Sequence, residues 1–586
     1  RLGLKSSMFS CVGTDEMGLF LRDNLENEGV DTRLLRSTPK NLTGLVLLGV
    51  NPPDQFPLIF YRENCADMQI LPDDVNPEIF REAKALLITG TGLSTLSMRK
   101  ATRHAVKTAK ESGCAVILDI DFRPVLWGLT EAGDGETRFV ASATVTREIQ
   151  SFLSELDLIV GTEEEIMIAG GEQTIEKSLS TIGDQSFATV VLKRGAEGCM
   201  VYSSDFSSPV SARSFKIEVL NVLGAGDSFL SGFLRGWLRN ESLENCALYG
   251  NACGALVVTR HGCAPSSPSF SEVEYFLRNF DQVPNLPHHP KMNNLHSLTE
   301  FGIQRNRRLL ILDLDHRNKY EESCRKMNLP QDKIARFKEL VYTGFKSVSQ
   351  KINQNNLAIL IDQKYGMKIL NDSSDFNYTL GVPVEDEGVS PLNWICEGSL
   401  YQYLLKNPGT WFVKVHFIFH TEMNAEDKKN QLIQLRKLSG VCLELKRKLM
   451  VELLNSGDLY QEDALNVNEV ELTTVIDEIY KEGIYPYWWK INPLDTKEKW
   501  LKINEIINEN DPEVGLIFQY NYSQIKKLPT WINFTRLNSQ NFGLAVGESI
   551  FWETWEKYLN GNAEDVEVIS EFSERFQKLL NVWTDY

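Results

Sequence analysis

Short apolar runs alternate with helical patterns over roughly the first 280 residues of the chain. The runs that we expect to form strands are 8–13, 85–90, 115–119, 156–161 and 189–193, with helices over 93–112 and 228–239. Continuously apolar strands separated by helices are typical of a largely parallel sheet that is buried on both faces. The pattern therefore predicts a three-layer α/β/α domain.

Two apolar segments, 45–50 and 56–62, break this alternation. Both are short and mostly apolar, and only a few residues separate them, as in a β-hairpin. We expect them to form a small lid sheet over the site.

The second half of the chain offers eight further strand candidates, most of them separated by helical segments such as 428–438 and 469–481. The candidates are 309–315, 357–362, a weak one near 378–380, 411–419, 448–454, 486–491, 514–519 and 542–546. Eight strand–helix units in about 280 residues are the size of a (β/α)₈ barrel. We therefore expect a TIM-barrel domain.

A proline-rich stretch at 283–290 separates the two patterns and predicts a linker. We place the first domain at 1–281, the linker at 282–300 and the barrel at 301–586. The stretch contains His288 and His289, which could be metal ligands or part of a solvated linker.

The composition restricts the classes of function. A chain of 586 residues is too long for one hydrophobic core. Its formal net charge of −18 argues against binding to nucleic acid or an anionic membrane, because nothing would offset repulsion from phosphates. The sequence contains no run of 18 or more apolar residues, so no transmembrane helix is expected. The first residues lack the apolar core of a signal peptide. Because 8–13 already reads as a strand, we expect the domain to begin before Arg1.

The ten cysteines are scattered, and several lie in apolar stretches such as 113–118. No Cys-x-x-Cys pair occurs. This usage favours buried, reduced thiols in a cytosolic protein over a disulfide framework or a zinc site.

The segment 221–233 is the most informative part of the sequence. Gly224 and Gly226 bracket Ala225, and Asp227 follows at the start of a helical pattern. Glycines accept positive φ and leave backbone N–H groups free, while the helix start carries a partial positive charge. Together these features favour an anion-binding site for a phosphate, and Asp227 could take a proton from an attacking hydroxyl. The alternative interpretation is a tight turn before a helix.

This segment resembles the second signature of the PfkB (ribokinase-like) carbohydrate kinases, Asp-Thr-x-Gly-Ala-Gly-Asp, with Asn221 and Val222 in place of Asp-Thr. Three companion segments follow in the family's order. Residues 119–123 resemble its Asp-x-Asn-x-Arg segment, where Arg123 would hold substrate or form a buried ion pair in the turn. Residues 161–165 resemble its Asn-x-x-Glu motif, where Glu165 would act on a magnesium shell or serve as a helix-terminal acid.

Two further matches concern the nucleotide side. Lys193 and Gly195 fall in a segment that matches the family's Lys-x-Gly-x-x-Gly turn. Asn251 lies in a segment that resembles the wall of the adenine pocket, or it makes local hydrogen bonds within its helix. Within the family, the chain looks most like the members that phosphorylate 5-dehydro-2-deoxygluconate in inositol catabolism. This likeness lies in residues 57–67 and 221–227, and the first of these segments contains Arg62, a candidate substrate ligand.

The resemblance covers residues 1 to about 280 and implies ATP and Mg²⁺ as cofactors, a small sugar acid as substrate, a homo-oligomer and a cytoplasmic location. The family's first strand and its sugar-binding Gly-Gly-x-x-x-Asn segment would lie before Arg1. Two alternatives stay open: a kinase of another sugar whose barrel is an inert oligomerisation module, and a degenerate protein that only binds a ligand.

Polar residues lie on several apolar strands of the predicted barrel and need partners inside it. Asp315 ends the first strand, Lys414 lies on the fourth, Glu452 on the fifth and Lys490 on the sixth. Two lysines with carboxylates suit imine chemistry, in which one lysine attacks a carbonyl while the other cation lowers its pKa. Glu452 would shuttle protons. The alternative is structural ion pairing.

This layout resembles the class I, Schiff-base aldolases and the barrel domain fused to this kinase in some bacteria. By that resemblance, Lys490 would form the imine and the domain would cleave the phosphorylated product of the kinase. Two positions depart from the pattern: Glu548 replaces an arginine that would face a phosphate, and Gln519 lies where a glycine is expected.

Overall fold

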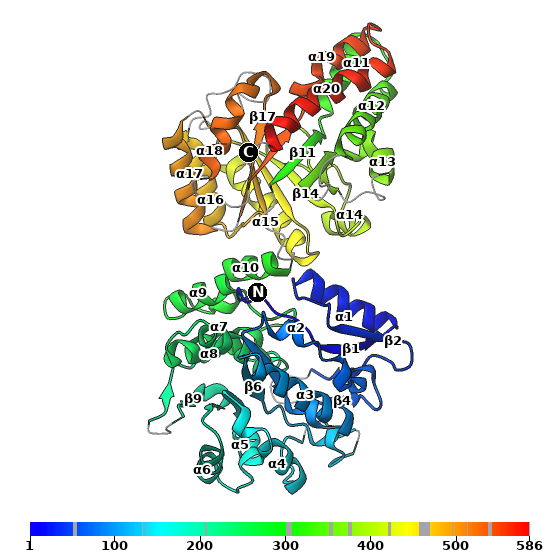
Figure 1. Cartoon of the computed structure of the whole chain (residues 1–586). Coiled ribbons are helices and arrows are strands. Elements are labelled where there is room, and N and C mark those ends of the chain that lie inside the picture. The colour runs from blue at the N-terminus through cyan, green and yellow to red at the C-terminus, as the bar shows by residue number, and fades with distance from the viewer. Residues whose placement is uncertain are drawn as a thin grey trace. The chain divides into compact units, whose positions relative to one another are not determined.

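The protein forms two compact units, Arg1–Ile303 and Gln304–Tyr586, in the computed structural model (Figure 1). The structure describes residues 1–50, 56–131, 133–135, 137–204, 208–300, 308–350, 356–372, 378–419, 423–455, 469–494, 496–511, 514–536 and 542–584. Each unit is described separately below.

A six-stranded sheet forms the centre of the first unit, in the order β10-β9-β8-β7-β6-β5. Its strands are β5 (Ala85–Thr89), β6 (Ala115–Asp119), β7 (Leu158–Thr162), β8 (Thr189–Lys193), β9 (Cys199–Tyr202) and β10 (Val210–Ser211). The first four are parallel, whereas β9 and β10 pair antiparallel. The predicted strands and the largely parallel sheet are confirmed.

Helices cover both faces of this sheet, as its continuously apolar strands require. On one face, Leu118 and Ile159 pack in a core with α3 (Leu96–Glu111), α4 (Ala143–Gln150), α5 (Glu163–Gly170) and α6 (Ile175–Gln185). On the other face, Ile117 and Val160 pack with α7 (Ala225–Trp237) and α8 (Leu243–Val257). The first unit is therefore a three-layer α/β/α domain, as predicted.

Two small sheets accompany the main one. Strands β1 (Ser10–Gly13) and β2 (Leu35–Thr38) pair in parallel, and α1 (Glu16–Asn27) connects them. Strands β3 (Leu45–Leu48) and β4 (Leu58–Tyr61) pair antiparallel and form the predicted hairpin. Residues 51–55 between them lie outside the described part.

The structure differs from the expected linker. Leu286 in the 3₁₀ helix η7 (Leu286–His288) and Met292 in α10 (Pro290–Glu300) are buried against α9 (Phe270–Asn279). His296 on α10 also pairs with the buried Glu272 of α9 at 3.3 Å. Residues 286–300 therefore pack on the first unit, because their apolar positions are spaced for burial. Neither His288 nor His289 belongs to a group of close metal-binding side chains among the described residues.

The second unit is a closed barrel of eight parallel strands, β11 to β18, in sequence order. They are β11 (Leu309–Leu314), β12 (Leu357–Ile361), β13 (Thr379–Pro383), β14 (Phe412–Phe419), β15 (Leu449–Asn455), β16 (Trp488–Ile491), β17 (Gly515–Tyr520) and β18 (Phe542–Val546). Pairing of Leu309 with Gly543 joins the last strand to the first. All eight predicted strands, including the weak one near 378–380, are present.

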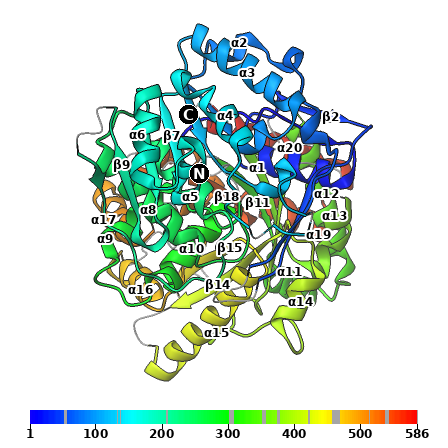
Figure 2. The same ribbon diagram turned by 90° about the horizontal axis from the view of Figure 1, so that it is seen from below.

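Helices surround this barrel on its outer side. They are α11 (Asn318–Lys326), α12 (Asp332–Ser349), α13 (Gln363–Asp372), α14 (Leu400–Lys406), α15 (Ala425–Glu444), α16 (Glu469–Lys481), α17 (Lys497–Asn510), α18 (Leu528–Arg536), α19 (Glu548–Leu559) and α20 (Asp565–Thr584). In both views α16 and α17 lie on the opposite side of the barrel from α12 and α13 (Figures 1 and 2). The predicted (β/α)₈ fold is confirmed.

The barrel interior changes from apolar to charged along the strands. Ile311, Leu360 and Met450 belong to an interior apolar cluster. Two residues further along their strands, Asp313 and Glu452 occupy the same inward face, since side chains alternate along a strand. The charged groups therefore lie toward the C-terminal ends of the strands, where barrel enzymes bind their substrates.

The ten cysteines are free, and eight of them are buried. Among the described residues, no helix combines the length and the apolar character that crossing a membrane requires.

Candidate functional site

The Gly-Ala-Gly segment forms the start of α7. Gly224 has a φ of 82° and is the residue before the first helical turn, so the helix begins at Ala225, three residues earlier than predicted. A Cβ on Gly224 would lie 2.6 Å from Cys263 Sγ. The expected positive φ thus belongs to Gly224 and not to Gly226, whose backbone is part of the helix.

The side chain of Asn221 holds this loop in place through hydrogen bonds. Its side chain is buried, and its Nδ2 donates to the Gly262 carbonyl at 2.8 Å. Its Oδ1 accepts from the Leu223 N–H at 2.8 Å. The residue that replaces the family's aspartate therefore holds the turn that presents Gly224.

Asp227 lies in the first turn of α7 and its side chain is exposed. The protein atoms around it nevertheless raise the pKa of this carboxyl through desolvation, and the charge of Asp121 raises it further. Lys193 and Arg123 act in the opposite direction. Asp227 is therefore an exposed carboxyl among charged groups, and its pKa is above that of an ordinary aspartate.

Lys193, at the end of β8, pairs with two acidic residues, one at the end of β6 and one in the first turn of α5. Its Nζ lies 3.2 Å from Asp119 Oδ1 at the end of β6 and 3.8 Å from Glu165 Oε2. A Cβ on Gly226 would lie 3.4 Å from the same Nζ, which places the ammonium beside the α7 N-terminus. Burial raises the pKa of Asp119 to about 6 although Lys193 opposes this effect. Asp119 was not among the predicted site residues, and its place at a strand end was the available signal.

Arg123 forms the ion pair in the turn that the alternative interpretation predicted, and its role in holding substrate stays a prediction. Its guanidinium lies 2.7 Å from Asp121 Oδ1 and 3.9 Å from Glu165 Oε1, which is an ion pair in the turn after β6. Its charge also acts on Asp227. The structure thus brings Asp121, Arg123, Lys193 and Asp227 together from three elements.

Glu165 serves as a helix cap. Its Oε2 accepts from the Thr162 N–H at 2.8 Å, in a reciprocal capping box at the start of α5. Its Oε1 accepts from the Phe122 N–H at 3.2 Å. Both oxygens of this buried carboxylate accept hydrogen bonds. A magnesium ion could use only their remaining lone pairs, and the magnesium role of Glu165 stays a prediction.

Three predicted residues lie apart from this group. Asn251 donates to the Ala212 and Arg213 carbonyls at 3.3 and 3.0 Å, so its bonds join α8 to a distant segment and are not local to its helix, and its adenine-pocket role stays a prediction. Gly195 has a φ of 55° in the turn after β8. Arg62 pairs with Asp67 next to the β3–β4 hairpin.

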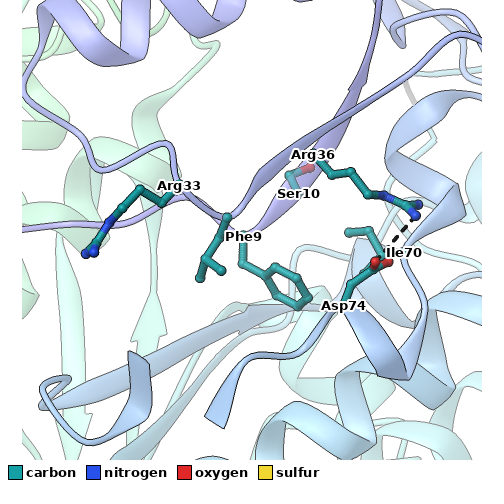
Figure 3. A pocket seen from close by; sticks show the side chains of 7 residues that line it. Phe9, Ser10, Arg33, Arg36, Ile70 and Asp74 are labelled. Atoms are coloured by element: carbon teal, nitrogen blue, oxygen red, sulfur yellow. Dashed lines mark ion pairs between the residues drawn. The ribbon is translucent and has the colours of Figure 1, made fainter. Parts of the chain in front are cut away.

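A separate cavity of about 250 Å³ lies beside β1 (Figure 3). It is lined by Phe9, Ser10, Arg33, Leu34, Arg36, Ile70 and Asp74. Arg36 and Asp74 form an ion pair across it at 3.4 Å. None of the predicted site residues contributes to this cavity.

In the barrel, the structure brings together all four residues that the sequence selected. Lys490 Nζ lies 2.8 Å from Glu452 Oε1. Lys414 Nζ lies 3.1 Å from Glu452 Oε2 and 2.7 Å from Asp315 Oδ2. All four side chains are buried. Glu452 therefore connects the two lysines at the C-terminal end of the barrel.

Three further members of this cluster were not predicted. Asp313 lies 2.5 Å from Lys490, Glu385 lies 3.3 Å from Lys414, and His416 Nε2 lies 2.8 Å from Glu452. Asp313 and His416 are two residues from Asp315 and Lys414 on the same strands. Side chains two residues apart on a strand lie on the same face, and this spacing was the signal that could have found Asp313 and His416.

The charges of this cluster correct one expectation. Burial and the charge of Lys414 lower the pKa of Lys490, but Asp313 and Glu452 outweigh both, so the pKa is raised rather than depressed. Burial similarly opposes ionisation of Glu452, yet the two lysines hold the pKa of this carboxyl well below its usual range. Burial raises the pKa of Asp313 to about 6. The free site thus holds protonated lysines between carboxylates.

Glu548 and Gln519 lie at the ends of β18 and β17. Lys319 donates to Glu548 Oε2 at 3.0 Å, so a lysine partly neutralises the carboxylate that replaces the expected arginine. A Cβ on Gly547 would lie 3.3 Å from Gln519 Nε2 and 3.0 Å from His316 Cε1, which places both side chains at this part of the mouth.

The first unit is thus an α/β domain whose sheet is covered on both faces, with a lysine and a carboxylate beside a helix start that follows a glycine, an arrangement that can bind a phosphate. Residues 1–269 match the pfkB family carbohydrate kinases, and the chain belongs to that family. Residues 272–586 match a second family, described as an uncharacterized protein conserved in bacteria (DUF2090), and the chain belongs to it as well.

Several known proteins are similar to the first unit. The chain is 29% identical over 294 residues to the 5-dehydro-2-deoxygluconokinase of Geobacillus thermodenitrificans, a match that covers 49% of this chain and 83% of the relative. It is 30% identical over 282 residues to the 5-dehydro-2-deoxygluconokinase of Listeria monocytogenes serotype 4b, a match that covers 47% of this chain and 82% of the relative. A solved fructokinase from Vibrio cholerae with fructose, ADP and calcium aligns at 25% identity, with a TM-score of 0.41, over 47% of this chain and 86% of that one.

Proposed function

We propose that the first unit transfers a phosphoryl group from ATP to a primary hydroxyl of 5-dehydro-2-deoxygluconate. The observation that carries this proposal is the position of Asp227, exposed in the first turn of α7 beside Lys193 and Arg123. The two relatives that bear the name of this kinase support the choice of sugar acid.

The residues around Asp227 fit a nucleotide phosphate. The free N–H groups of the first α7 turn and the Lys193 ammonium offer positive charge at one place. The carboxylates of Asp121 and Glu165 would hold Mg²⁺ through water, as this ion prefers. When bound, the Mg²⁺–ATP complex supplies the phosphoryl group and part of the charge neutralisation.

The chain's own residues perform the remaining work. Asp227 accepts the proton of the attacking hydroxyl, and its raised pKa makes it a stronger base than an ordinary aspartate. Lys193 and the α7 N-terminus stabilise the charge that develops on the phosphoryl oxygens. Arg123 orients anionic groups of the substrate through its planar fork.

An ADP-release assay of the full chain over a panel of sugars and sugar acids tests this proposal. We expect release that depends on 5-dehydro-2-deoxygluconate and is lost in the Asp227→Asn variant. Preference for another sugar would contradict the proposed substrate but retain the kinase. Absence of release with every sugar would favour a protein that only binds its ligand.

For the barrel we propose imine chemistry, with Lys490 attacking the carbonyl of the phosphorylated keto acid before carbon–carbon cleavage. The arrangement that favours it is the contact of two carboxylates with the buried Lys490: Asp313, whose pKa burial raises to about 6, lies 2.5 Å away and can accept its proton, and Glu452 at 2.8 Å connects it to Lys414. Structural ion pairing and an inert module for homo-oligomer assembly are the alternatives. Trapping of the imine, argued in the Discussion, distinguishes them.

A further inference from the structure

Two groups of acidic and imidazole side chains meet at the barrel mouth and share Asp315. The first consists of Asp315, Glu385 and His416, and the second of Asp313, Asp315 and His316. Within each group, one potential ligand atom per residue lies within 4.8 Å of the others. The two groups differ in what already neutralises them.

A lysine neutralises the first group. Lys414 Nζ lies 2.7 Å from Asp315 Oδ2 and 3.3 Å from Glu385 Oε1, and it also contacts His416 Nε2. An ammonium therefore stands where a metal ion would bind. This group needs no further cation.

In the second group each aspartate pairs with a lysine through one oxygen, while Asp315 Oδ1 and His316 Nδ1 have no hydrogen-bond partner among the described residues. Lys490 contacts Asp313 through Oδ2, and Lys414 contacts Asp315 through Oδ2. Asp315 Oδ1 and His316 Nδ1 lie 3.7 Å apart, and both atoms are buried without a hydrogen-bond partner among the described residues. The Asp315 side chain is only 3% exposed. Leaving such atoms unsatisfied is costly, which indicates a partner outside the chain.

Further donor atoms lie beside this pair. Gln519 Oε1 and Glu548 Oε1 are also buried and have no hydrogen-bond partner among the described residues. The Gln519 amide and the His316 ring converge on Gly547, and the charge of Glu548 acts on His316. The mouth therefore presents one imidazole nitrogen and several oxygen atoms that have no hydrogen-bond partner among the described residues.

We propose that Asp315 and His316, with Asp313 as a third ligand, bind a divalent transition-metal ion at the barrel mouth. A mixed set of carboxylate oxygen and imidazole nitrogen suits Mn²⁺, Fe²⁺ or Zn²⁺, whereas Mg²⁺ prefers oxygen alone. The ion would add positive charge next to Glu548, where an anionic or carbonyl oxygen of a ligand would otherwise meet repulsion. The site does not depend on whether the barrel performs imine chemistry.

Metal titration of the full chain tests the proposal. The protein is stripped with a chelator, desalted and titrated with Co²⁺ in the absence of nucleotide, so that the kinase site does not contribute a nucleotide-bound ion. Calorimetry and the visible absorption of Co²⁺ are recorded together. We expect one saturable site with nitrogen ligation in the wild type, and a loss of at least about tenfold in affinity in His316→Gln and Asp315→Asn. His104→Gln, an exposed histidine on α3, is the matched control and should bind as the wild type does.

Several results would overturn the site. They are the absence of saturable binding, equal binding in His316→Gln, or equal losses in His316→Gln and His104→Gln, which would indicate adventitious surface binding. Loss in His416→Gln alone would move the ion to the group that Lys414 neutralises. Circular dichroism confirms that each variant is folded, and if Asp315→Asn is not, the partly exposed His316 carries the test. A gain in the wild-type melting temperature with Mn²⁺ that is absent in His316→Gln is the independent measurement.

Discussion

The ammonium nitrogen of Lys193 lies 3.4 Å from the point that a Cβ atom on Gly226 would occupy. Apart from its chain neighbours and the backbone of α7, no other described heavy atom lies within 4 Å of that point. The glycine therefore leaves room between a helix N-terminus and a lysine, which is the room that a phosphate needs. This relationship gives the first prediction.

Gly226→Val should weaken ATP binding, because its branched side chain would displace the Lys193 ammonium from the phosphate. Loss of a hydrogen bond to a charged group costs about 1.5–3 kcal/mol, which corresponds to about ten- to a hundredfold in Kd. Calorimetry of ATP binding measures this change, and Gly226→Ala should have the smaller effect. Unchanged affinity in Gly226→Val would contradict the phosphate site. The fold should be retained, since Gly226 has an ordinary helical φ.

Asp227→Asn should abolish phosphoryl transfer while it leaves the fold and nucleotide binding largely intact. Loss of a general base typically lowers the rate by about 10²–10⁴. The side chain is exposed, so its substitution leaves no buried group unpaired. Steady-state turnover and ATP affinity, measured on the same preparation, separate the two effects. Turnover close to that of the wild type would remove Asp227 from the mechanism.

The pH dependence of the kinase should reflect the raised pKa of Asp227. The carboxylate must be deprotonated to accept a proton, so the rate falls as pH decreases through its pKa. Desolvation and Asp121 raise this pKa, which places the loss at a higher pH than for an ordinary aspartate near 3.9. Asp121→Asn removes one negative neighbour and should therefore move the acidic limb to lower pH. A limb that stays in place or moves upward would contradict the assignment of this limb to Asp227.

The sequence predicted the strands well because parallel strands that are buried on both faces read as continuous apolar runs. The run 542–546 coincides with β18, and even the weak run near 378–380 marks β13. Helix starts were less accurate. The positive φ of Gly224 ends the loop, so Gly226 and Asp227 already belong to α7.

Two other differences depend on tertiary contacts that no local pattern contains. The proline-rich segment packs on the first unit because Leu286 and Met292 find an apolar surface there. The pKa of Lys490 is raised because Asp313, which the sequence analysis did not select, contacts it directly. Spacing on a strand shows which residues share a face, but not which charges touch.

Lys338→Met should strongly destabilise the barrel. Lys338 on α12 is buried, and its Nζ donates to the Leu314 and His316 carbonyls at 2.7 and 2.9 Å and pairs with buried Asp362. Removing one partner of a buried ion pair leaves an uncompensated charge and costs about 3–5 kcal/mol. Denaturant unfolding measures the loss. Lys368→Met, which breaks an exposed pair with Glu339, is the matched control and should cost about 0–1 kcal/mol. Equal effects in both variants would contradict this account.

Borohydride with the phosphorylated keto acid should trap a covalent adduct on Lys490. The lysine is 1% exposed on β16, between Asp313 at 2.5 Å and Glu452 at 2.8 Å, and Asp313, whose pKa burial raises to about 6, is in position to accept its proton. Lys414 is held by Asp315 and Glu385 as well as by Glu452, which leaves its ammonium more fully engaged than that of Lys490. The imine should therefore form on Lys490.

Peptide mapping by mass spectrometry locates the adduct. Lys490→Arg keeps a cation between Asp313 and Glu452 but cannot form an imine, so it should remove the adduct without unfolding the barrel. The dephosphorylated keto acid is the companion substrate, because Glu548 should disfavour a phosphate by Coulomb repulsion even with Lys319 as its partner. More adduct with the dephosphorylated acid would show that imine chemistry is present while the phosphorylated product is not its substrate. An adduct on Lys414 would reverse the roles of the two lysines, and no adduct with either acid would favour structural ion pairing inside an inert barrel.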